Sequence, residues 1–387
     1  YSQSLSIFPE TKKIFQSHYP NFKNKNLVQK DLANTLKIIA SEGKKGFYEG
    51  EVAEKISKEI IENNGLISKS DLKKYNPIWR EPLISNYRDT KVITMGPPSS
   101  GGLHVIQMLN ILENYDLNKI GHNSSEYINL LAEVMKYAYA DRSKYLGDPD
   151  FYEVPIRKII SKEYANEISK NIEIGKLRPA KQIHPGEFMR KESHETTHFS
   201  VADKQGNVVS MTYTLNSTFG SKVVIEGTGI LMNNEMDDFS AAPGVPNQFN
   251  LLGAEANEIA PFKRPLSSMT PTIVLRNDEL FFTTGSPGGA RIISAVLQSI
   301  LNIIDFNMNL EDTTLAKRIH HQWYPDILEY EFKLDKNIED DLKKIGYKTS
   351  SKLPLTSLQT IMFADGIYYG YGDFRRVDAL ASGKIYD

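Results

Sequence analysis

The strongest constraint on the fold is a change of hydrophobic pattern near Thr196. Before that position, apolar residues recur at three- to five-residue spacings, which is typical of helices that bury one face. After it, short apolar runs are separated by turn residues, which is typical of β-hairpins. Strands followed by helices that pack on them favour an α+β layered fold over an alternating parallel sheet.

Three segments predict helices in the first half of the chain, which reads as mainly helical. Segment 49–65 ends at Asn64-Gly65, and its predicted core face is Val52, Ile56, Ile60 and Ile61. Ser68 or Ser70-Asp71 is expected to cap the short helix that follows. Segments 101–116 and 124–146 predict two longer helices. The second has Ser124 or Ser125 as its cap, and its core residues are Leu130, Leu131, Val134, Met135 and Ala138.

The second half predicts two hairpins and a helix. Segment 198–216 reads as two strands around an Asp-Lys-Gln-Gly-Asn turn. Segment 271–285 repeats the pattern around Asn277-Asp278. Segment 285–305 begins as a glycine-rich loop and continues as an amphipathic helix.

Composition excludes several classes of function. Lys plus Arg is 46 and Asp plus Glu is 48, so the net charge of −2 offers no field for nucleic acid or anionic lipid. The chain has no cysteine, which excludes disulfides, thiolate metal sites and a cysteine nucleophile. No apolar run approaches the roughly 20 residues of a membrane-spanning helix.

Common cofactor and metal motifs are also missing from the sequence. It contains no dinucleotide or P-loop glycine motif, no HExxH and no GxSxG. His320-His321 reads as two core or surface histidines, because neighbouring side chains do not face one metal. Asp148 in LGDPDF reads as the cap of a turn rather than a cation ligand, and Asp237-Asp238 does not suit a catalytic dyad. No cofactor and no metal is expected.

Two stretches carry possible chemistry. In ETTHFSVAD (195–203), a threonine hydroxyl could serve as a nucleophile if the bond before it were cut, because its own α-amino group would then act as base. From the local pattern alone, ordinary strand residues remain the better interpretation. GSPGGAR (285–291) could expose two backbone N–H groups as an oxyanion hole, or it could be a tight strand-to-helix turn. PPSSGG (97–102) looks similar but has no catalytic partner nearby.

A set of long, ordered motifs resembles the γ-glutamyltransferases (γ-glutamyltranspeptidases) over essentially the whole chain. These are PPSSGGLHVIQMLNILENYD, YAYADRSKYLGDPDF, TTHFSVAD, TYTLNSTFGS, GILMNNEMDDFSAAPGVPN, KRPLSSMTPTIV, TGSPGGARII and HHQW. The resemblance implies an N-terminal-nucleophile hydrolase with a four-layer αββα sandwich. It also implies that a precursor cuts itself into a mostly helical large-subunit part, 1–195, and a small subunit, 196–387, which together form one αββα unit.

The resemblance implies specific catalytic roles. Thr196 would be the nucleophile, freed by cleavage of the Glu195–Thr196 bond. Thr214 matches the threonine whose hydroxyl bonds the nucleophile; a plain cross-strand contact is the alternative for it. Gly288 and Gly289 match the oxyanion-hole glycines.

The resemblance also implies where the glutamyl group binds. Asn216, Glu235 and Asp238 match the positions that hold the substrate α-amino group, although the acidic stretch alone would read as a polar turn. Ser267 and Ser268 match the donors to the α-carboxylate.

Two departures from the family pattern stand out. The arginine that pairs with the substrate α-carboxylate lies in a region of the large subunit that has no counterpart in this chain. Phe249, in the lid-like loop PGVPNQFNLLGA (243–254), aligns where bacterial relatives often carry a tyrosine.

The resemblance therefore implies an enzyme that transfers the γ-glutamyl group of glutathione and related amides to water, amino acids or dipeptides. It implies association of the large and small subunits as a heterodimer and a periplasmic or secreted location. The rivals are a related acylase, a poly-γ-glutamate depolymerase, or a non-catalytic paralogue that kept the fold.

Overall fold

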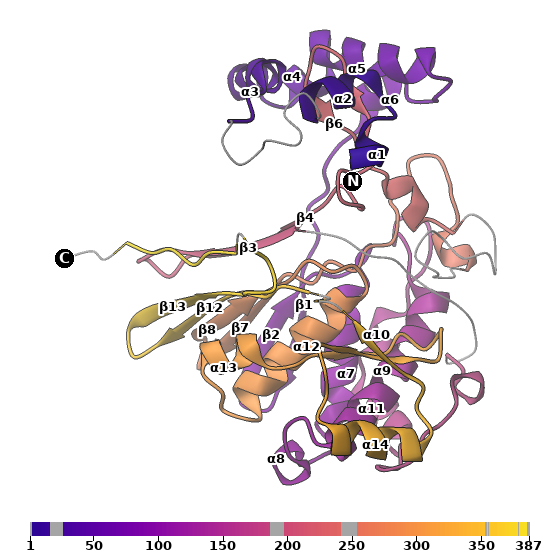
Figure 1. Ribbon diagram of the computed structural model, residues 1–387, viewed down its shortest axis with the longest axis vertical. Helices are drawn as coiled ribbons and strands as arrows, with labels where there is room; N and C mark the ends of the chain where they lie inside the picture. The colour runs from indigo at the N-terminus through magenta and orange to yellow at the C-terminus, as the bar shows by residue number, and fades with distance from the viewer. Residues whose placement is uncertain are drawn as a thin grey trace. The chain divides into compact units, whose positions relative to one another are not determined.

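The computed structural model describes residues 2–15, 26–185, 197–240, 254–352, 354, 356–377 and 379–384 (Figure 1). The chain forms two compact units. The first comprises Tyr1–Arg80 with Leu215–Asn234, and the second comprises Glu81–Thr214 with Glu235–Asp387. This division follows contacts in space. The predicted division at residue 195 is instead a proposed cut in the backbone. Residue 195 lies outside the described residues, so this division stays a prediction.

The first unit is a set of helices with a small β-ribbon. Its elements are α1 (Ser2–Leu5), α2 (Pro9–Phe15), α3 (Lys30–Glu42), α4 (Lys44–Tyr48), α5 (Gly50–Glu62), α6 (Lys69–Lys74), β5 (Val224–Ile225) and β6 (Ile230–Leu231). Val52 and Ile56 of α5 pack with Ile225 in a small core. The Thr35 hydroxyl donates to the Thr228 carbonyl over 2.8 Å, so the ribbon is tied to α3.

The predicted helix in segment 49–65 is confirmed, except for one core residue. Ile61 is 52% exposed, because it follows Ile60 directly and a helix turns by about 100° per residue. The predicted cap is confirmed as a capping box. Ser68 accepts from the Asp71 N–H, and the Asp71 side chain accepts from the Ser68 N–H.

A six-stranded antiparallel sheet dominates the second unit, with the strand order β1-β2-β7-β8-β12-β13. Its strands are β1 (Leu83–Tyr87), β2 (Thr90–Thr94), β7 (Thr272–Arg276), β8 (Glu279–Thr284), β12 (Gln359–Ala364) and β13 (Ile367–Gly372). The predicted hairpin β7–β8 is confirmed, and both of its turn residues, Asn277 and Asp278, have positive φ. Strands β1 and β2 lie in the first half of the chain, for which the sequence pattern predicted only helices.

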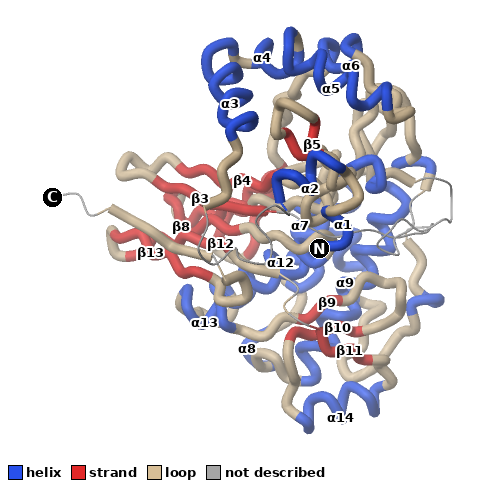
Figure 2. Tube along the Cα trace, turned by 45° about the horizontal axis from the view of Figure 1, so that its top comes forward, coloured by secondary structure: helices blue, strands red, loops and turns tan. Residues whose placement is uncertain are grey.

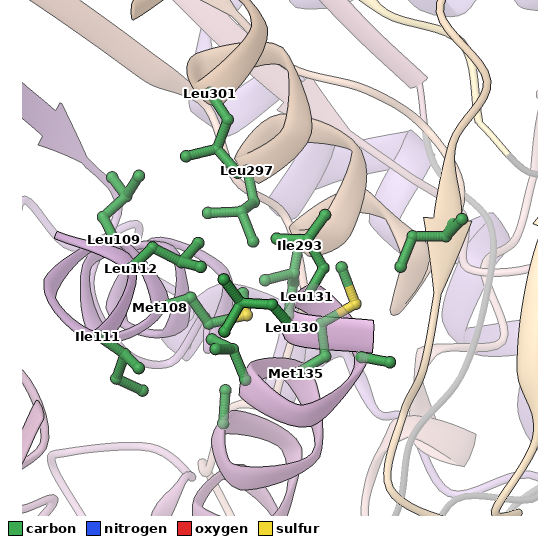
Figure 3. Packing of buried hydrophobic residues seen from close by; sticks show 14 of the residues in the cluster. Met108, Leu109, Ile111, Leu112, Leu130, Leu131, Met135, Ile293, Leu297 and Leu301 are labelled. Atoms are coloured by element: carbon green, nitrogen blue, oxygen red, sulfur yellow. The ribbon is translucent and has the colours of Figure 1, made fainter. Parts of the chain in front are cut away.

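Helices α7 (Gly101–Leu112), α9 (Ser125–Tyr145) and α12 (Arg291–Ile304) form the main core beside this sheet (Figures 1 and 2). All three confirm predicted helices, and Ser124 caps α9. Their apolar side chains interlock, as Figure 3 shows for Met108, Leu109, Ile111, Leu112, Leu130, Leu131, Met135, Ile293, Leu297 and Leu301. Unlike the one-sided helix predicted, α7 is buried along its whole length.

Shorter elements complete the second unit. These are α8 (Leu117–Ile120), α10 (Ile156–Ile159), α11 (Lys162–Ser169), α13 (Leu310–Leu315), α14 (Lys336–Ile345), the three-stranded sheet of β9 (Ile319–His320), β10 (Leu328–Glu331) and β11 (Thr349–Lys352), and the 3₁₀ turns η2 (Ala180–Gln182), η3 (Glu235–Asp238) and η4 (Glu255–Asn257). Within the described ranges, no helix is both long and apolar enough to cross a membrane.

The hairpin of β3 (Thr197–Ala202) and β4 (Val208–Tyr213) forms a further layer. It lies on the face of the six-stranded sheet opposite α7 and α12 (Figure 1). Asp203 shapes its turn by accepting from the N–H groups of Gln205 and Asn207, both at 2.9 Å. Helices, sheet and hairpin thus form stacked layers within the second unit, which agrees with the predicted α+β class.

Candidate active site

The open end of the β3–β4 hairpin is the place where the predicted nucleophile would join the fold. Thr197 is the first residue of β3 and pairs with Tyr213 of β4. Thr214 follows Tyr213 directly, at the same end of the hairpin. Thr196 and Glu195 lie outside the described residues, as does Phe249, so their roles stay predictions.

His198 fastens this end of the hairpin to the glycine loop. Its ring is buried, with Nδ1 2.8 Å from Thr212 Oγ1. A Cβ added to Gly285 would lie 2.1 Å from the ring, so only glycine fits beneath it. Burial lowers the pKa of His198 to about 4, so the ring is neutral at pH 7. Sequence reasoning missed this residue.

Two serine hydroxyls hold the rest of the hairpin on the large sheet. Ser200 Oγ donates to the Gln359 carbonyl over 2.9 Å, and Ser210 Oγ donates to the Thr284 carbonyl over 3.2 Å. These carbonyls belong to the start of β12 and the end of β8. The middle of the hairpin is therefore bonded to Gln359 and Thr284, and Gln359 in turn donates to the Gly285 carbonyl of the loop after β8.

The glycine loop leads from β8 into α12. Gly288 has φ +135° and Gly289 has φ +58°, values that side-chain-bearing residues rarely adopt. The loop is pinned because the Gly285 carbonyl accepts from the Gln359 N–H at 2.9 Å, and Ser286 Oγ accepts from the Ser357 N–H at 3.1 Å. The loop precedes the N-terminus of a 14-residue helix, whose dipole favours negative charge at that end. This location suits the predicted oxyanion-hole role.

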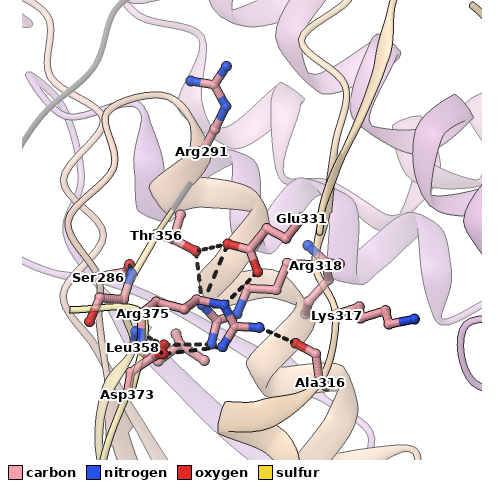
Figure 4. A network of polar contacts seen from close by, with 12 residues as sticks. Ser286, Arg291, Ala316, Lys317, Arg318, Glu331, Thr356, Leu358, Asp373 and Arg375 are labelled. Carbon is pink, nitrogen blue, oxygen red and sulfur yellow. Dashed lines mark hydrogen bonds and ion pairs between the residues drawn. The ribbon is translucent and has the colours of Figure 1, made fainter. Parts of the chain in front are cut away.

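A buried network of two arginines and two carboxylates supports the residues that pin the loop (Figure 4). Arg318 Nη2 lies 2.8 Å from Asp373 Oδ2, and Arg375 Nε lies 2.7 Å from Glu331 Oε2. Asp373 Oδ2 also accepts from the Leu358 N–H over 2.8 Å. Burial opposes ionisation of Asp373, but the two guanidinium groups hold its pKa below the usual value. Sequence reasoning missed this network.

The carboxylate turn η3 places Glu235 and Asp238 together. A 3₁₀ turn has three residues per turn, so positions three apart lie on one face. Burial raises the pKa of Glu235 to about 8, and a hydrogen bond with Asp238 and the charge of that carboxylate add to the effect. The acidic pair is thus Glu235 with Asp238, and not the adjacent Asp237 with Asp238. Such a pair can accept hydrogen bonds from an ammonium group.

Asn257 ties the carboxylate turn to the serine loop. Its side chain is 5% exposed; Nδ2 donates to the Asp238 carbonyl over 2.7 Å, and Oδ1 accepts from the Leu266 N–H over 3.0 Å. Leu266 immediately precedes Ser267. One buried amide therefore fixes the spacing between an acidic turn and a pair of hydroxyls, and sequence reasoning had no signal for it.

The PPSSGG motif proves to be the cradle of the serine loop. The Ser100 N–H and hydroxyl both donate to the Ser267 carbonyl at 2.8 Å. The Ser99 hydroxyl donates to the Met269 carbonyl at 2.6 Å. A Cβ on Gly101 would lie 2.1 Å from Thr270 Oγ1, so the two loops approach as closely as glycine permits.

Asn216, the third predicted amine ligand, belongs to the first unit. It is buried with φ +69°, and its Nδ2 donates to the Asn234 carbonyl over 3.2 Å. Its role toward a substrate stays a prediction.

The residues dismissed as ligands have structural roles. His320 Nδ1 lies 2.9 Å from Ser294 Oγ, and His321 Nε2 lies 3.2 Å from Asp326 Oδ1, both deep in the core. Asp148 caps its turn by accepting from the Asp150 N–H over 3.2 Å. In the ranges that the structure describes, no group of three or more His, Asp or Glu side chains is placed to hold a metal.

The second unit stacks helix, sheet and hairpin layers and places the start of β3 beside the glycine loop, as expected for an N-terminal-nucleophile hydrolase. The chain belongs to the Gamma-glutamyltranspeptidase family, whose sequence model matches residues 1–383. It is 47% identical to the glutathione hydrolase proenzyme of Escherichia coli over 99% of its own length and 66% of that protein. It is 41% identical to the glutathione hydrolase proenzyme of a Pseudomonas species over 92% of its own length and 64% of that protein.

A solved structure supports the fold. The cephalosporin acylase from Bacillus halodurans superposes on 95% of this chain and 70% of its own, with a TM-score of 0.78 and 25% sequence identity. The α+β class and the N-terminal-nucleophile hydrolase sandwich are thereby confirmed. The chain spans just under two thirds of the length of the two glutathione hydrolase proenzymes that it matches, at 66% and 64%.

Proposed function

We propose that the protein is a γ-glutamyltransferase and glutathione hydrolase that cuts itself between Glu195 and Thr196. The freed Thr196 amine takes the proton of the Thr196 hydroxyl, which attacks the γ-carbonyl of the substrate. The N–H groups of Gly288 and Gly289 stabilise the resulting oxyanion. The amine product leaves with the proton, and water or an amino acid then releases the γ-glutamyl group from the threonine ester.

The observation that carries this proposal is the link through Asn257 between the carboxylate turn and the serine loop. A γ-glutamyl group carries an ammonium and a carboxylate on one carbon. Glu235 and Asp238 suit the ammonium, and Ser267 and Ser268 suit the carboxylate. A fixed spacing between the two halves favours a substrate that bears both groups.

The proposal extends to the assembly and its surroundings. The large and small subunits are expected to stay together as a heterodimer after the cut. Glutathione and other γ-glutamyl compounds are the expected donors, amino acids or dipeptides the acceptors, and no cofactor takes part. A periplasmic or secreted location is proposed, in line with the absence of cysteine.

The second candidate is an acylase that accepts another acyl group, which the superposition with a cephalosporin acylase favours. Hydrolysis rates of γ-glutamyl-p-nitroanilide and glutaryl-p-nitroanilide distinguish the two, because the glutaryl group keeps the terminal carboxylate but lacks the α-amino group that Glu235 and Asp238 are proposed to bind. Faster hydrolysis of the glutaryl amide would reject the proposed substrate.

The cut itself is tested by intact mass and N-terminal sequencing of the full-length protein. Thr196→Ala should remain one chain without turnover, whereas the control Thr197→Ala should still split before Thr196. Cleavage near this position in Thr196→Ala would show that the nucleophile is assigned to the wrong residue.

A further inference from the structure

Arg142 is a buried cation directly behind the serine loop. It lies in α9 and is 2% exposed. Its Nε donates to Ser100 Oγ over 2.7 Å, and its Nη2 lies 3.4 Å from both the Ser267 carbonyl and Ser268 Oγ. The guanidinium therefore contacts both the loop and the cradle that holds it.

These contacts fix the direction in which the two serine hydroxyls can donate. A guanidinium has only donors, so Ser268 Oγ accepts from Arg142 and turns its own hydrogen away from that side. Ser267 Oγ likewise accepts from the Met269 N–H over 3.1 Å. Both hydroxyls are thus set as donors, and an ionised carboxylate is a pure acceptor.

The charge of Arg142 adds to this orientation. Burial lowers the pKa of Arg142 to about 9, while Tyr139 and Asp238 counteract the shift, so the group stays cationic at pH 7. A buried positive charge acts on a nearby anion with little screening by water. Lysine would not serve as well, because its single ammonium lacks the planar fork that here spans Ser100, Ser267 and Ser268.

We propose that Arg142 is the positioning residue that makes the serine loop selective for γ-glutamyl groups with an α-carboxylate. It acts through Ser267 and Ser268 rather than by direct contact. It thereby supplies, from behind the site, positive charge to a loop whose own donors are neutral hydroxyls. This inference rests on the proposed function of the same site.

The test compares two substrates in the cleaved, full-length enzyme. γ-Glutamyl-p-nitroanilide carries the α-carboxylate, and 4-aminobutyryl-p-nitroanilide lacks only that group. Arg142→Met should raise KM for the first substrate by about tenfold to a hundredfold and leave KM for the second unchanged. Arg142→Lys should lie between the wild type and Arg142→Met. Lys136→Met is the matched control, because it removes another buried cation of α9 that pairs with Glu133.

An equal rise of KM for both substrates, or an unchanged ratio of the two KM values, would overturn the proposal, because a purely structural role of Arg142 would not distinguish the substrates. If Arg142→Met fails to fold, Ser100→Ala must raise KM for γ-glutamyl-p-nitroanilide relative to KM for 4-aminobutyryl-p-nitroanilide, since it removes the acceptor of the 2.7 Å bond. A wild-type enzyme that does not hydrolyse γ-glutamyl-p-nitroanilide would instead refute the proposed function itself.

Discussion

Glu235 should make substrate capture depend on pH in a way that can be separated from the rest of the mechanism. Its pKa is raised to about 8, first by burial and then by Asp238. A protonated carboxyl cannot pair with the substrate ammonium, so capture should strengthen as the pH rises through about 8. The Thr196 amine, with a reference pKa of about 7.7–8.0, must also lose a proton, so the wild-type profile alone does not isolate Glu235.

The variant Glu235→Gln separates the two ionisations. Glutamine resembles the protonated carboxyl, so wild type and variant should converge at low pH. The ionisation of the Thr196 amine affects both proteins equally and cancels in the ratio of wild-type to variant kcat/KM. This ratio should rise with pH, with a midpoint near the Glu235 pKa of about 8. At high pH it should level off at about tenfold to a hundredfold, the range for hydrogen bonds between charged groups. At pH 7 about a tenth of Glu235 is ionised, so the ratio should be about two for a tenfold plateau and about ten for a hundredfold plateau.

The assay is kcat/KM for γ-glutamyl-p-nitroanilide from about pH 6 to 9 at constant ionic strength, because kcat/KM reports ionisations of the free enzyme. Glu255→Gln, an exposed carboxyl on the neighbouring turn η4, should give a ratio of one throughout. A ratio for Glu235→Gln that stays constant from about pH 6 to 9, as it would if the pKa of Glu235 lay near the ordinary glutamate value of 4.5, would refute the reasoning.

Two further predictions concern the glycine loop. Gly289→Ala should lower kcat by about a hundredfold to a thousandfold, because a residue forced away from φ +58° displaces an oxyanion donor; Gly206→Ala, with φ +85° in an exposed turn, should leave kcat unchanged. Arg375→Met should lower the free energy of unfolding by about 3–5 kcal/mol in urea titrations, because it leaves the buried carboxylates of Glu331 and Asp373 without one of their cationic partners. Arg276→Met, whose ion pair with Asp89 is solvent-exposed, should lower it by less than about 1 kcal/mol.

The parts of the fold that were predicted correctly have local signals. Capping of α6 by Ser68 involves residues three apart, and the Asn277-Asp278 turn depends on residues that tolerate positive φ. Strands β1 and β2 were missed because their place in the sheet depends on a distant partner. Val92 pairs with Val274, and no periodic pattern within a short strand identifies such a neighbour.

The residues of the candidate site also divide into those that the sequence located and those that it did not. Its glycines and serines stand in contiguous motifs, so the resemblance located them. Arg142 left a weaker trace that could have been followed. It lies four residues beyond Ala138 and seven beyond Met135, on the predicted core face of α9, and a charge on such a face indicates a buried partner. Asn257 and His198 left none, because their partners (Asp238 and Leu266 for Asn257, Gly285 for His198) lie in other segments to which no local periodicity points.

Each loop of the site is held by a buried polar group, and this has a physical reason. Hydrophobic contacts are non-directional, so they bring segments together without fixing where an N–H or O–H points. A hydrogen bond fixes direction: Asn257 fixes the carboxylate turn, Arg142 the serine hydroxyls, and Asp373 the residues that pin the glycine loop. Burying these groups costs desolvation energy that apolar side chains would avoid. An apolar replacement such as Arg142→Met should therefore impair substrate selection more than stability, because what it removes is the orientation of donors rather than the cohesion of the core.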